Sequence, residues 1–177
     1  MTRDQAQTLT VVSARRVSPS ATAEYQAKMK IPCAVLGIRT VDDALVGVEF
    51  LPVSESILDP SDDFTQRVCA QIAAYIRDPG FVFDVPLRLS GTPHQSKVWQ
   101  ALRGIPCGRP QTYGALAQQL DSSPRAVGGA CGDNPIPIFI PCHRVVAKNG
   151  AGGFMHHASG APLNIKAWLL RHEGWQL

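Results

Sequence analysis

The sequence is short of the features that would place a protein in a membrane or outside the cell. No apolar run in its 177 residues approaches the roughly 18 residues that a membrane-spanning helix needs. The first ten residues have neither the basic start nor the apolar core of a signal peptide. The five cysteines are odd in number, and none forms the close pair typical of zinc sites or redox couples. We therefore expect free thiols, no membrane partner and a reducing compartment, namely the cytoplasm or, in a eukaryote, the nucleus.

Charge is small overall but unevenly distributed. Residues 1–90 hold nine Lys and Arg against eleven Asp and Glu, whereas residues 91–177 hold eight against three. A basic second half is typical of a segment that binds a polyanion. An uneven scatter of solvated surface charge explains a difference of this size equally well, so charge alone does not decide the partner.

Residues 1–90 have the pattern of a small α/β domain. Residues 1–25 show little apolar periodicity and are expected to be a loosely ordered entry or a first edge strand. Two β-rich runs, 33–39 and 44–51, flank the turn-favouring Asp42-Asp43 and predict an antiparallel hairpin. From Ser61, as the N-cap, a helix is predicted to run to the Asp78-Pro79-Gly80 stop, with one apolar face formed by Phe64, Val68, Ile72 and Ile76. A short strand over 81–87 precedes the turn-rich 90–93, where we place the domain boundary.

Residues 91–177 have the pattern of a mainly helical domain. A helix is predicted over 95–105, ended by the Pro- and Gly-rich segment 106–110. Thr112 caps a short helix to Leu120, and Pro124 begins another that ends at Cys131, which together outline a helix-turn-helix. A last helix is predicted over 162–172, with Gly174 as its stop. The predicted class is therefore α+β, with domains at 1–90 and 91–177.

The informative motif is the segment from Pro141 to Val146, in which Cys142 is followed by His143 and Arg144. A base and positive charge beside a thiol lower its pKa from about 8.5 and favour the nucleophilic thiolate. For a Cys-His pair taken alone, an inert core cysteine followed by a capping histidine is the commoner outcome. Adjacent side chains do not readily hydrogen-bond each other, so His143 as a base would act through a water molecule.

Two residues near the C-terminal end are candidates to complete such a site. Glu173 is the only acid after Asp133 and could orient the imidazole, although an ordinary exposed glutamate is equally compatible with its position. Lys166 lies two helical turns earlier on the same face, so one helix could present both groups. His156-His157 has no cysteine or acid at ligand spacing, so we expect neither a metal nor another cofactor.

Beyond these residues, an ordered series of motifs over about residues 31–177 resembles the O6-alkylguanine-DNA alkyltransferases, also called methylated-DNA–protein-cysteine methyltransferases. The matching motifs are Phe83 to Leu87, Gly91-Thr92-Pro93, Val98-Trp99 with Leu102, Ile105-Pro106, Gly108, Thr112-Tyr113, Leu116-Ala117, Arg125 to Ala130, Asn134-Pro135, Pro137, Pro141 to Val146, Asn149-Gly150, Gly152-Gly153-Phe154, Lys166, Trp168-Leu169-Leu170 and Glu173-Gly174. The resemblance implies a ribonuclease H-like sheet with a helix in the first domain, and a helix-turn-helix in the second.

The resemblance also implies a reaction. Cys142 would accept an alkyl group irreversibly from O6-alkylguanine, and from O4-methylthymine, in double-stranded DNA, so that each molecule acts once. His143 would deprotonate Cys142 through water, and Glu173 would orient His143. Tyr113 would help to rotate the nucleotide and donate a proton to the guanine ring. Base flipping costs a few kcal/mol, which is lower for a poorly paired lesion and helps to select it.

The implied DNA contacts come from the helix-turn-helix. Arg125 would occupy the gap in the base stack, with a plain phosphate contact as the alternative. The small residues of the recognition helix would let it press into the minor groove without reading base edges. The full DNA-binding set is Thr112, Tyr113, Arg125, Ala126, Gly128, Gly129 and Ala130.

The implied pocket has six members, of which Asn134 is a hinge and Val145 offers a carbonyl to the guanine amino group. The set is Asn134, Pro137, Val145, Phe154, Ser159 and Lys166. His94 and Pro110 depart from the family pattern but lie outside the chemistry, whereas a longer loop around 155–162 weakens the assignment of Ser159. We expect a monomer, with cooperative binding to DNA left open.

Three other functions compete with this interpretation. A cysteine hydrolase would bring its histidine from far along the chain, whereas here the histidine is adjacent to the cysteine. A non-catalytic protein that binds alkyl lesions would not need Cys142. A regulator activated by methylation would need a second DNA-binding domain or a cysteine cluster before the repair-like unit.

Overall fold

The computed structural model describes residues 24–176, so most of the predicted entry segment 1–25 lies outside the described residues. Three antiparallel strands, β1 (Ala27–Ile31), β2 (Ala34–Val41) and β3 (Ala44–Leu51), form a sheet in the order β1-β2-β3. The predicted hairpin is confirmed, and its two turn residues, Asp42 and Asp43, have φ of 47° and 52°. Aspartate tolerates this left-handed conformation, which tight hairpin turns need. Strand β1 was not predicted.

Helix α1 (Asp63–Arg77) follows the sheet and confirms the predicted helix. Its N-cap is Asp62 and not Ser61 as predicted, because the Asp62 carboxylate accepts the backbone N–H of Thr65 at 2.8 Å. On its inner face Tyr75 is buried, whereas Ile76 is only partly buried. The helix therefore presents a phenol, with its hydroxyl, near its C-terminal end.

The predicted strand over 81–87 is wrong. Among the described residues this segment makes only one isolated bridge to the sheet, between Leu87 and Leu45. Pro86 has no N–H to offer a sheet, and the N–H of Asp84 donates to the side chain of Gln71 at 2.8 Å. The segment is consequently an extended loop that returns from α1 and meets the sheet at the beginning of β3.

The rest of the described chain is mainly helical. Its helices are α2 (Pro93–Arg103), α3 (Tyr113–Gln119), α4 (Pro124–Gly132) and α5 (Ala161–His172). Thr112 caps α3 as predicted and Ser123 caps α4, while α2 begins two residues before its predicted start because Thr92 and Gln95 form a capping box. Gly174, at φ 83°, follows α5 as predicted. Two features were not predicted, the 3-10 turn η1 (Cys142–Arg144) and a parallel pairing of β4 (Gln111–Thr112) with β5 (Val145–Val146).

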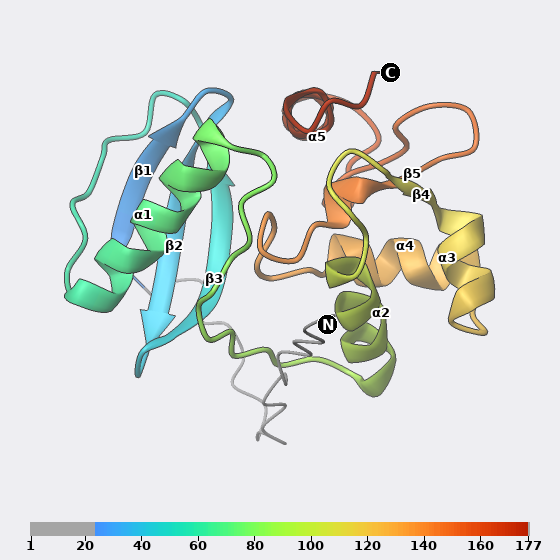
Figure 1. The fold of residues 1–177 in the computed structure, drawn as a ribbon, viewed down its shortest axis with the longest axis horizontal. Helices are drawn as coiled ribbons and strands as arrows, with labels where there is room; N and C mark the ends of the chain where they lie inside the picture. The colour runs from blue at the N-terminus through green and yellow to red at the C-terminus, as the bar shows by residue number, and fades with distance from the viewer. Residues whose placement is uncertain (1–23, 177) are drawn as a thin grey trace, which may run out of the picture.

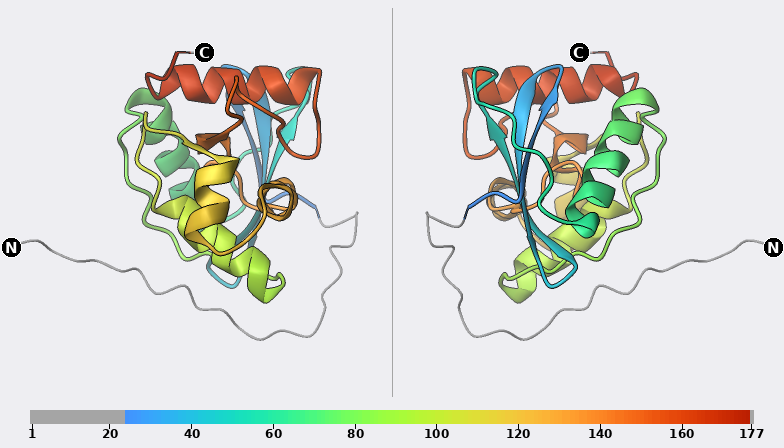
Figure 2. Two further views of the ribbon diagram at one scale, coloured as in Figure 1. Left: turned by 90° about the vertical axis from the view of Figure 1, so that its right-hand side faces the viewer. Right: turned by 90° about the vertical axis from the view of Figure 1, so that its left-hand side faces the viewer.

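Figure 1 shows the sheet and α1 on one side, α2, α3 and α4 on the other, and α5 at one end between them. Figure 2 shows α5 running across that end of the molecule. One buried apolar cluster includes sheet residues such as Leu36 and helix residues such as Trp99 and Leu169. The architecture is thus a small sheet and five helices on a shared core, and no helix within residues 24–176 has the length and hydropathy to cross a bilayer.

Candidate active site

Cys142 begins η1 and lies buried at one wall of a cavity. The chain before it is held by Asn134, whose Nδ2 donates to the carbonyl of Ile140 at 2.8 Å and whose Oδ1 accepts from the N–H of Ile136 at 3.0 Å. Burial raises the pKa of the Cys142 thiol, against the opposing effects of a hydrogen bond from Asn134 and the charge of Lys166. The sequence-based expectation of a lowered pKa is therefore wrong for this unliganded site.

The cavity has a volume of about 330 Å³ and lies between α4, Tyr113 and the loop after Gly152. It is within the range of pockets that hold small organic groups. The lining residues are Tyr113, Pro124, Gly128, Cys131, Gly132, Cys142, Gly153, Phe154, Met155, His156, His157 and Ala158. Phe154 lies here as predicted, whereas Cys131 was missed because nothing in the sequence marks which face of α4 it occupies.

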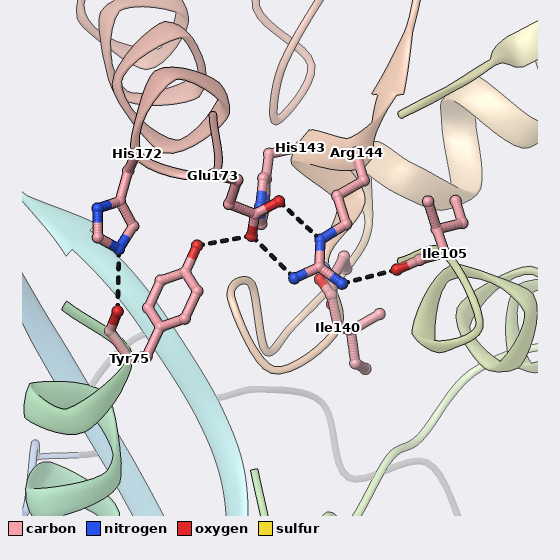
Figure 3. A network of polar contacts seen from close by, with 8 residues as sticks. Tyr75, Ile105, Ile140, His143, Arg144, His172 and Glu173 are labelled. Carbon is pink, nitrogen blue, oxygen red and sulfur yellow. Dashed lines mark hydrogen bonds and ion pairs between the residues drawn. The ribbon is translucent and has the colours of Figure 1, made fainter. Parts of the chain in front are cut away.

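His143 and Glu173 are brought together as the sequence suggested. The His143 Nε2 atom lies 2.9 Å from the Glu173 Oε1 atom, and both side chains are buried (Figure 3). An ionised carboxylate only accepts hydrogen bonds, so the imidazole proton sits on Nε2. The other ring nitrogen, Nδ1, is buried and has no hydrogen-bond partner within residues 24–176. The histidine is thereby set to accept a proton at Nδ1.

Glu173 also binds two groups that sequence reasoning did not place on it. Arg144 donates from Nη2 to Oε1 at 2.8 Å and from Nε to Oε2 at 2.9 Å, and its Nη1 donates to the carbonyl of Ile105. The Tyr75 hydroxyl donates to Oε1 at 2.8 Å. Arg144 thus serves the carboxylate and not the thiol, and Figure 3 shows how these groups converge on Glu173.

These contacts fix the charge states of the pair. Burial alone would raise the pKa of Glu173, but hydrogen bonds from His143 and Arg144 hold it well below its ordinary value. Burial lowers the pKa of His143, although Glu173 opposes that shift. The resting pair is therefore a neutral imidazole beside a carboxylate, the form that a general base requires.

Lys166 lies on α5, the helix whose C-cap residue is Glu173, and is fully buried. Its Nζ donates to the carbonyls of Val145 at 2.7 Å and Gly153 at 2.8 Å, and lies 3.4 Å from the Tyr113 hydroxyl. Burial lowers the pKa of Lys166 to about 8. Burial also raises the pKa of Tyr113, so its phenol stays protonated at neutral pH. The Tyr113 hydroxyl donates to the Gly153 carbonyl at 3.1 Å, so a protonated phenol lies at the cavity lining beside a cation.

Several predicted site residues lie elsewhere. Pro137 and Val145 are buried away from the cavity lining, and the Val145 carbonyl is already bonded to Lys166. Ser159 is exposed outside the lining, because the longer loop places Ala158 there. Ala130 packs into the core and its carbonyl accepts from Trp99, so it is not on the exposed face of α4.

Three of the other predicted DNA-binding residues, Arg125, Ala126 and Gly129, lie on the exposed face of α4. Arg125 and Ala126 are exposed, and a Cβ built on Gly129 would meet open space. Thr112 is partly buried and its hydroxyl caps α3. Gly128 lies against the Tyr113 ring, where a Cβ would come within 3.9 Å of it. The outer surface of α4 is accordingly thin, with one projecting charged side chain.

The loop around residues 155–162 contacts α4 through His156. Its Nε2 lies 2.8 Å from Asp133 Oδ1, and a Cβ on Gly132 would lie 2.4 Å from its ring, so only glycine permits this packing. No group of three or more His, Cys, Asp or Glu side chains in the described chain could hold a metal ion. His156 thus shapes the cavity rim through an aspartate.

Acid should destabilise the protein through the His143–Glu173 pair. Both pKa values are lowered on folding, so the unfolded chain takes up protons first, below about pH 6.5 for histidine and below about pH 4.3 for glutamate. We expect the free energy of unfolding in urea to fall as the pH is lowered from 7 to 5 and again to 4. Asp59→Asn, which removes an exposed carboxylate, should leave this dependence unchanged. A free energy that is constant over that range would contradict the charge assignment.

The fold and site define a protein with a buried thiol, a neutral base and a small cavity beneath two short helices. A family profile described as "6-O-methylguanine DNA methyltransferase, DNA binding domain" matches residues 93–175. The methylated-DNA–protein-cysteine methyltransferase of Salmonella typhimurium is 54% identical over 89 residues, which are 49% of this chain and 50% of that protein. The chain thus spans about half the length of that relative.

Two further comparisons cover more of the chain. The methylated-DNA–protein-cysteine methyltransferase of Methanosarcina acetivorans is 36% identical over 157 residues, 85% of this chain and 98% of that protein. The OGT of Mycobacterium tuberculosis, solved in complex with DNA, has a TM-score of 0.67 and 33% identity over 82% of this chain and 90% of that one. The chain belongs to the methylated-DNA–protein-cysteine methyltransferase family.

Proposed function

We propose that the protein repairs DNA by direct reversal, moving an alkyl group from O6-alkylguanine to Cys142 in a single turnover. The observation that carries this proposal is the buried thiol at the cavity wall, next to a histidine whose Nδ1 is free to accept a proton. The family membership and the DNA complex of the related structure support DNA as the partner. The same site supports O4-methylthymine as a second substrate, because the chemistry at oxygen is alike.

In the proposed reaction the Cys142 Sγ atom attacks the alkyl carbon, and the carbon–O6 bond breaks as the carbon–sulfur bond forms. The thiol proton passes through a water molecule to Nδ1 of His143, whose Nε2–H is held by Glu173. The guanine ring takes a proton from the Tyr113 hydroxyl, and the resulting phenolate takes a proton from the Lys166 ammonium beside it. A thioether remains on the protein, and no group at the site could cleave it.

A raised thiol pKa fits this sequence of events. Burial keeps Cys142 protonated in the resting site, so the thiol is protected from unrelated electrophiles. In the proposed reaction the adjacent His143 removes this proton through the water molecule.

We propose that α3 and α4 form a helix-turn-helix that docks in the minor groove. Their order and the tight turn at 121–123 support this interpretation, as does the thin outer face of α4. Arg125, exposed on that face, would fill the gap left by the flipped base. The domain boundary near residue 91, with a ribonuclease H-like first domain, remains our proposal; the profile match that begins at residue 93 supports it.

Arg125→Ala should slow transfer from duplex DNA by about tenfold while slowing transfer from the free O6-methylguanine base much less, because only duplex leaves a gap to fill. Single-turnover rates on both substrates measure this. Arg67→Ala on α1 is the matched control, since it removes one exposed positive charge from the other half of the molecule. Equal losses on both substrates would remove the proposed role of Arg125.

The proposed function is tested on the DNA product. After incubation with a duplex that holds one O6-methylguanine, nucleoside analysis should find one guanine restored for each protein molecule, and then no more. Restoration of more than one guanine for each protein molecule would indicate a hydrolase that acts in multiple turnovers. An unchanged lesion with DNA binding retained would favour the lesion-binding alternative and refute transfer.

A further inference from the structure

Tyr75 connects the sheet half of the molecule to the active site. It lies in the last turn of α1, 98 residues from Glu173 in sequence, yet its hydroxyl donates to the Glu173 Oε1 atom at 2.8 Å. The phenol ring is buried, with 1% of its surface exposed. This is the contact by which the first half of the chain touches the group that orients His143, and Figure 3 shows the phenol approaching the carboxylate from the α1 side.

The ring of Tyr75 is held on both sides. Phe83 packs against it with ring centroids 5.5 Å apart, and His172 meets it edge-on at 5.1 Å. The His172 Nε2 atom also lies 2.9 Å from the Tyr75 carbonyl, which ties the last turn of α5 to the last turn of α1. The hydroxyl therefore has little freedom to leave Glu173.

The Glu173 Oε1 atom accepts more hydrogen bonds than the Oε2 atom does. Tyr75, His143 and Arg144 all donate to it, whereas Oε2 accepts from Arg144 alone among the described residues. A neutral hydroxyl adds a hydrogen bond without adding a charge, so it fixes the carboxylate while leaving the charge balance with Arg144 unchanged. It also takes up part of the carboxylate's negative charge, which weakens the pull of Glu173 on the His143 proton.

We propose that Tyr75 is a positioning residue that acts through Glu173 to hold His143 in the neutral form and orientation needed to deprotonate Cys142. The inference rests on the proposed function. By this arrangement the first half of the chain, of which no described residue lines the cavity, sets the efficiency of the reaction in the second. Tyr75 was not singled out by sequence, since the only signal was an aromatic residue at a helix end.

Among the described residues, few titratable or charged groups surround the hydrogen bond between Tyr75 and Glu173. Around Tyr75 they are Glu173, Arg144, Cys107 and the ring of His172. Around His143 they are Glu173, Arg144 and Lys166. Removing the hydroxyl leaves all of these in place, so the carboxylate becomes the stronger partner of the His143 N–H and the pKa of His143 should rise toward its ordinary value.

Tyr75→Phe tests the proposal because it keeps the ring and deletes the hydroxyl. The full-length protein should transfer methyl from duplex DNA about tenfold more slowly, the effect of one hydrogen bond to a charged group. An NMR titration of the His143 ring should show a higher pKa than in the wild type, and the acidic limb of the single-turnover pH profile should move the same way.

Val68→Ala is the matched control, because it removes buried apolar atoms from the same helix, α1, and no polar group. It should lower the melting temperature without changing the His143 pKa or the transfer rate. It therefore measures how far a loss of stability by itself affects the transfer rate. A Tyr75→Phe protein with wild-type rate and His143 pKa would overturn the proposal. A rate loss in Tyr75→Phe that Val68→Ala reproduces at equal loss of stability would overturn it too. A wild-type protein that transfers nothing would instead refute the proposed function.

Discussion

Replacing Cys142 with serine should reduce alkyl transfer by more than about a thousandfold, to the background level, because a hydroxyl is far less acidic and less nucleophilic than a thiol. Proton transfer to His143 requires a donor whose pKa is not far above that of the imidazole. The pKa of a serine hydroxyl is far above it. Cys142 is buried at the cavity wall, so a serine of nearly the same size leaves the fold and the outer face of α4 unaltered. Binding to lesion-containing duplex should be retained, and single-turnover transfer with a parallel gel-shift titration measures both.

The chain offers a matched control in the same cavity. Cys131 is a second buried thiol in the lining, and burial raises its pKa to about 12. Cys131→Ser should keep most of the transfer rate, because His143, the base of the proposed reaction, directly follows Cys142 and not Cys131. Equal loss in the two variants would mean that the cavity as a whole, and not the thiol at 142, carries the reaction.

The second large effect is expected from Glu173→Gln. An amide cannot hold the His143 proton on Nε2 as a carboxylate does, and an uncharged side chain leaves Arg144 without its ionic partner. Transfer should fall by at least about a hundredfold, since loss of an orienting carboxylate disturbs the tautomer of its histidine. Breaking a buried ion pair from one side should also lower the free energy of unfolding by about 3–5 kcal/mol.

The transfer rate and the free energy of unfolding together show whether Glu173 orients His143 or only stabilises the fold. Measured in one buffer, the variant should lose both transfer and resistance to urea, and it should show a weaker dependence of stability on acid than the wild type, because the titrating carboxylate is gone. Glu55→Gln, which removes a surface carboxylate that pairs with Lys28, should change neither rate nor acid dependence appreciably. A stable Glu173→Gln protein with a normal rate would show that the carboxylate does not orient His143.

Local signals allowed much of the helical half to be predicted. Thr112 as a cap, Pro124 at a helix start and Gly174 after the last helix all report their own backbone geometry, so each was placed correctly. The segment over 81–87 was misread because its apolar residues suggested a strand while Pro86 and the Gln71 contact with Asp84 prevent one. Short pairings such as β4 with β5 depend on partners far along the chain, which no local pattern reveals.

The site was only partly predictable for the same reason. The motif at 141–146 and the lone acid at Glu173 marked the chemistry, and Glu173 does contact His143. The pKa of Cys142 was misjudged, because neighbouring charge is visible in sequence and burial is not. Tyr75 was missed because its partner is 98 residues away. The sequence indicates the chemistry that each residue offers, whereas tertiary packing determines which residues are in contact.

The proposed function requires that Cys142 receive the alkyl group from DNA. Intact-protein and peptide mass spectrometry after incubation with a duplex containing O6-methylguanine tests it most directly. We expect the mass of one added methyl group, on the peptide that holds Cys142 and on no other. Unmodified protein, or a methyl group on a different residue, would contradict it.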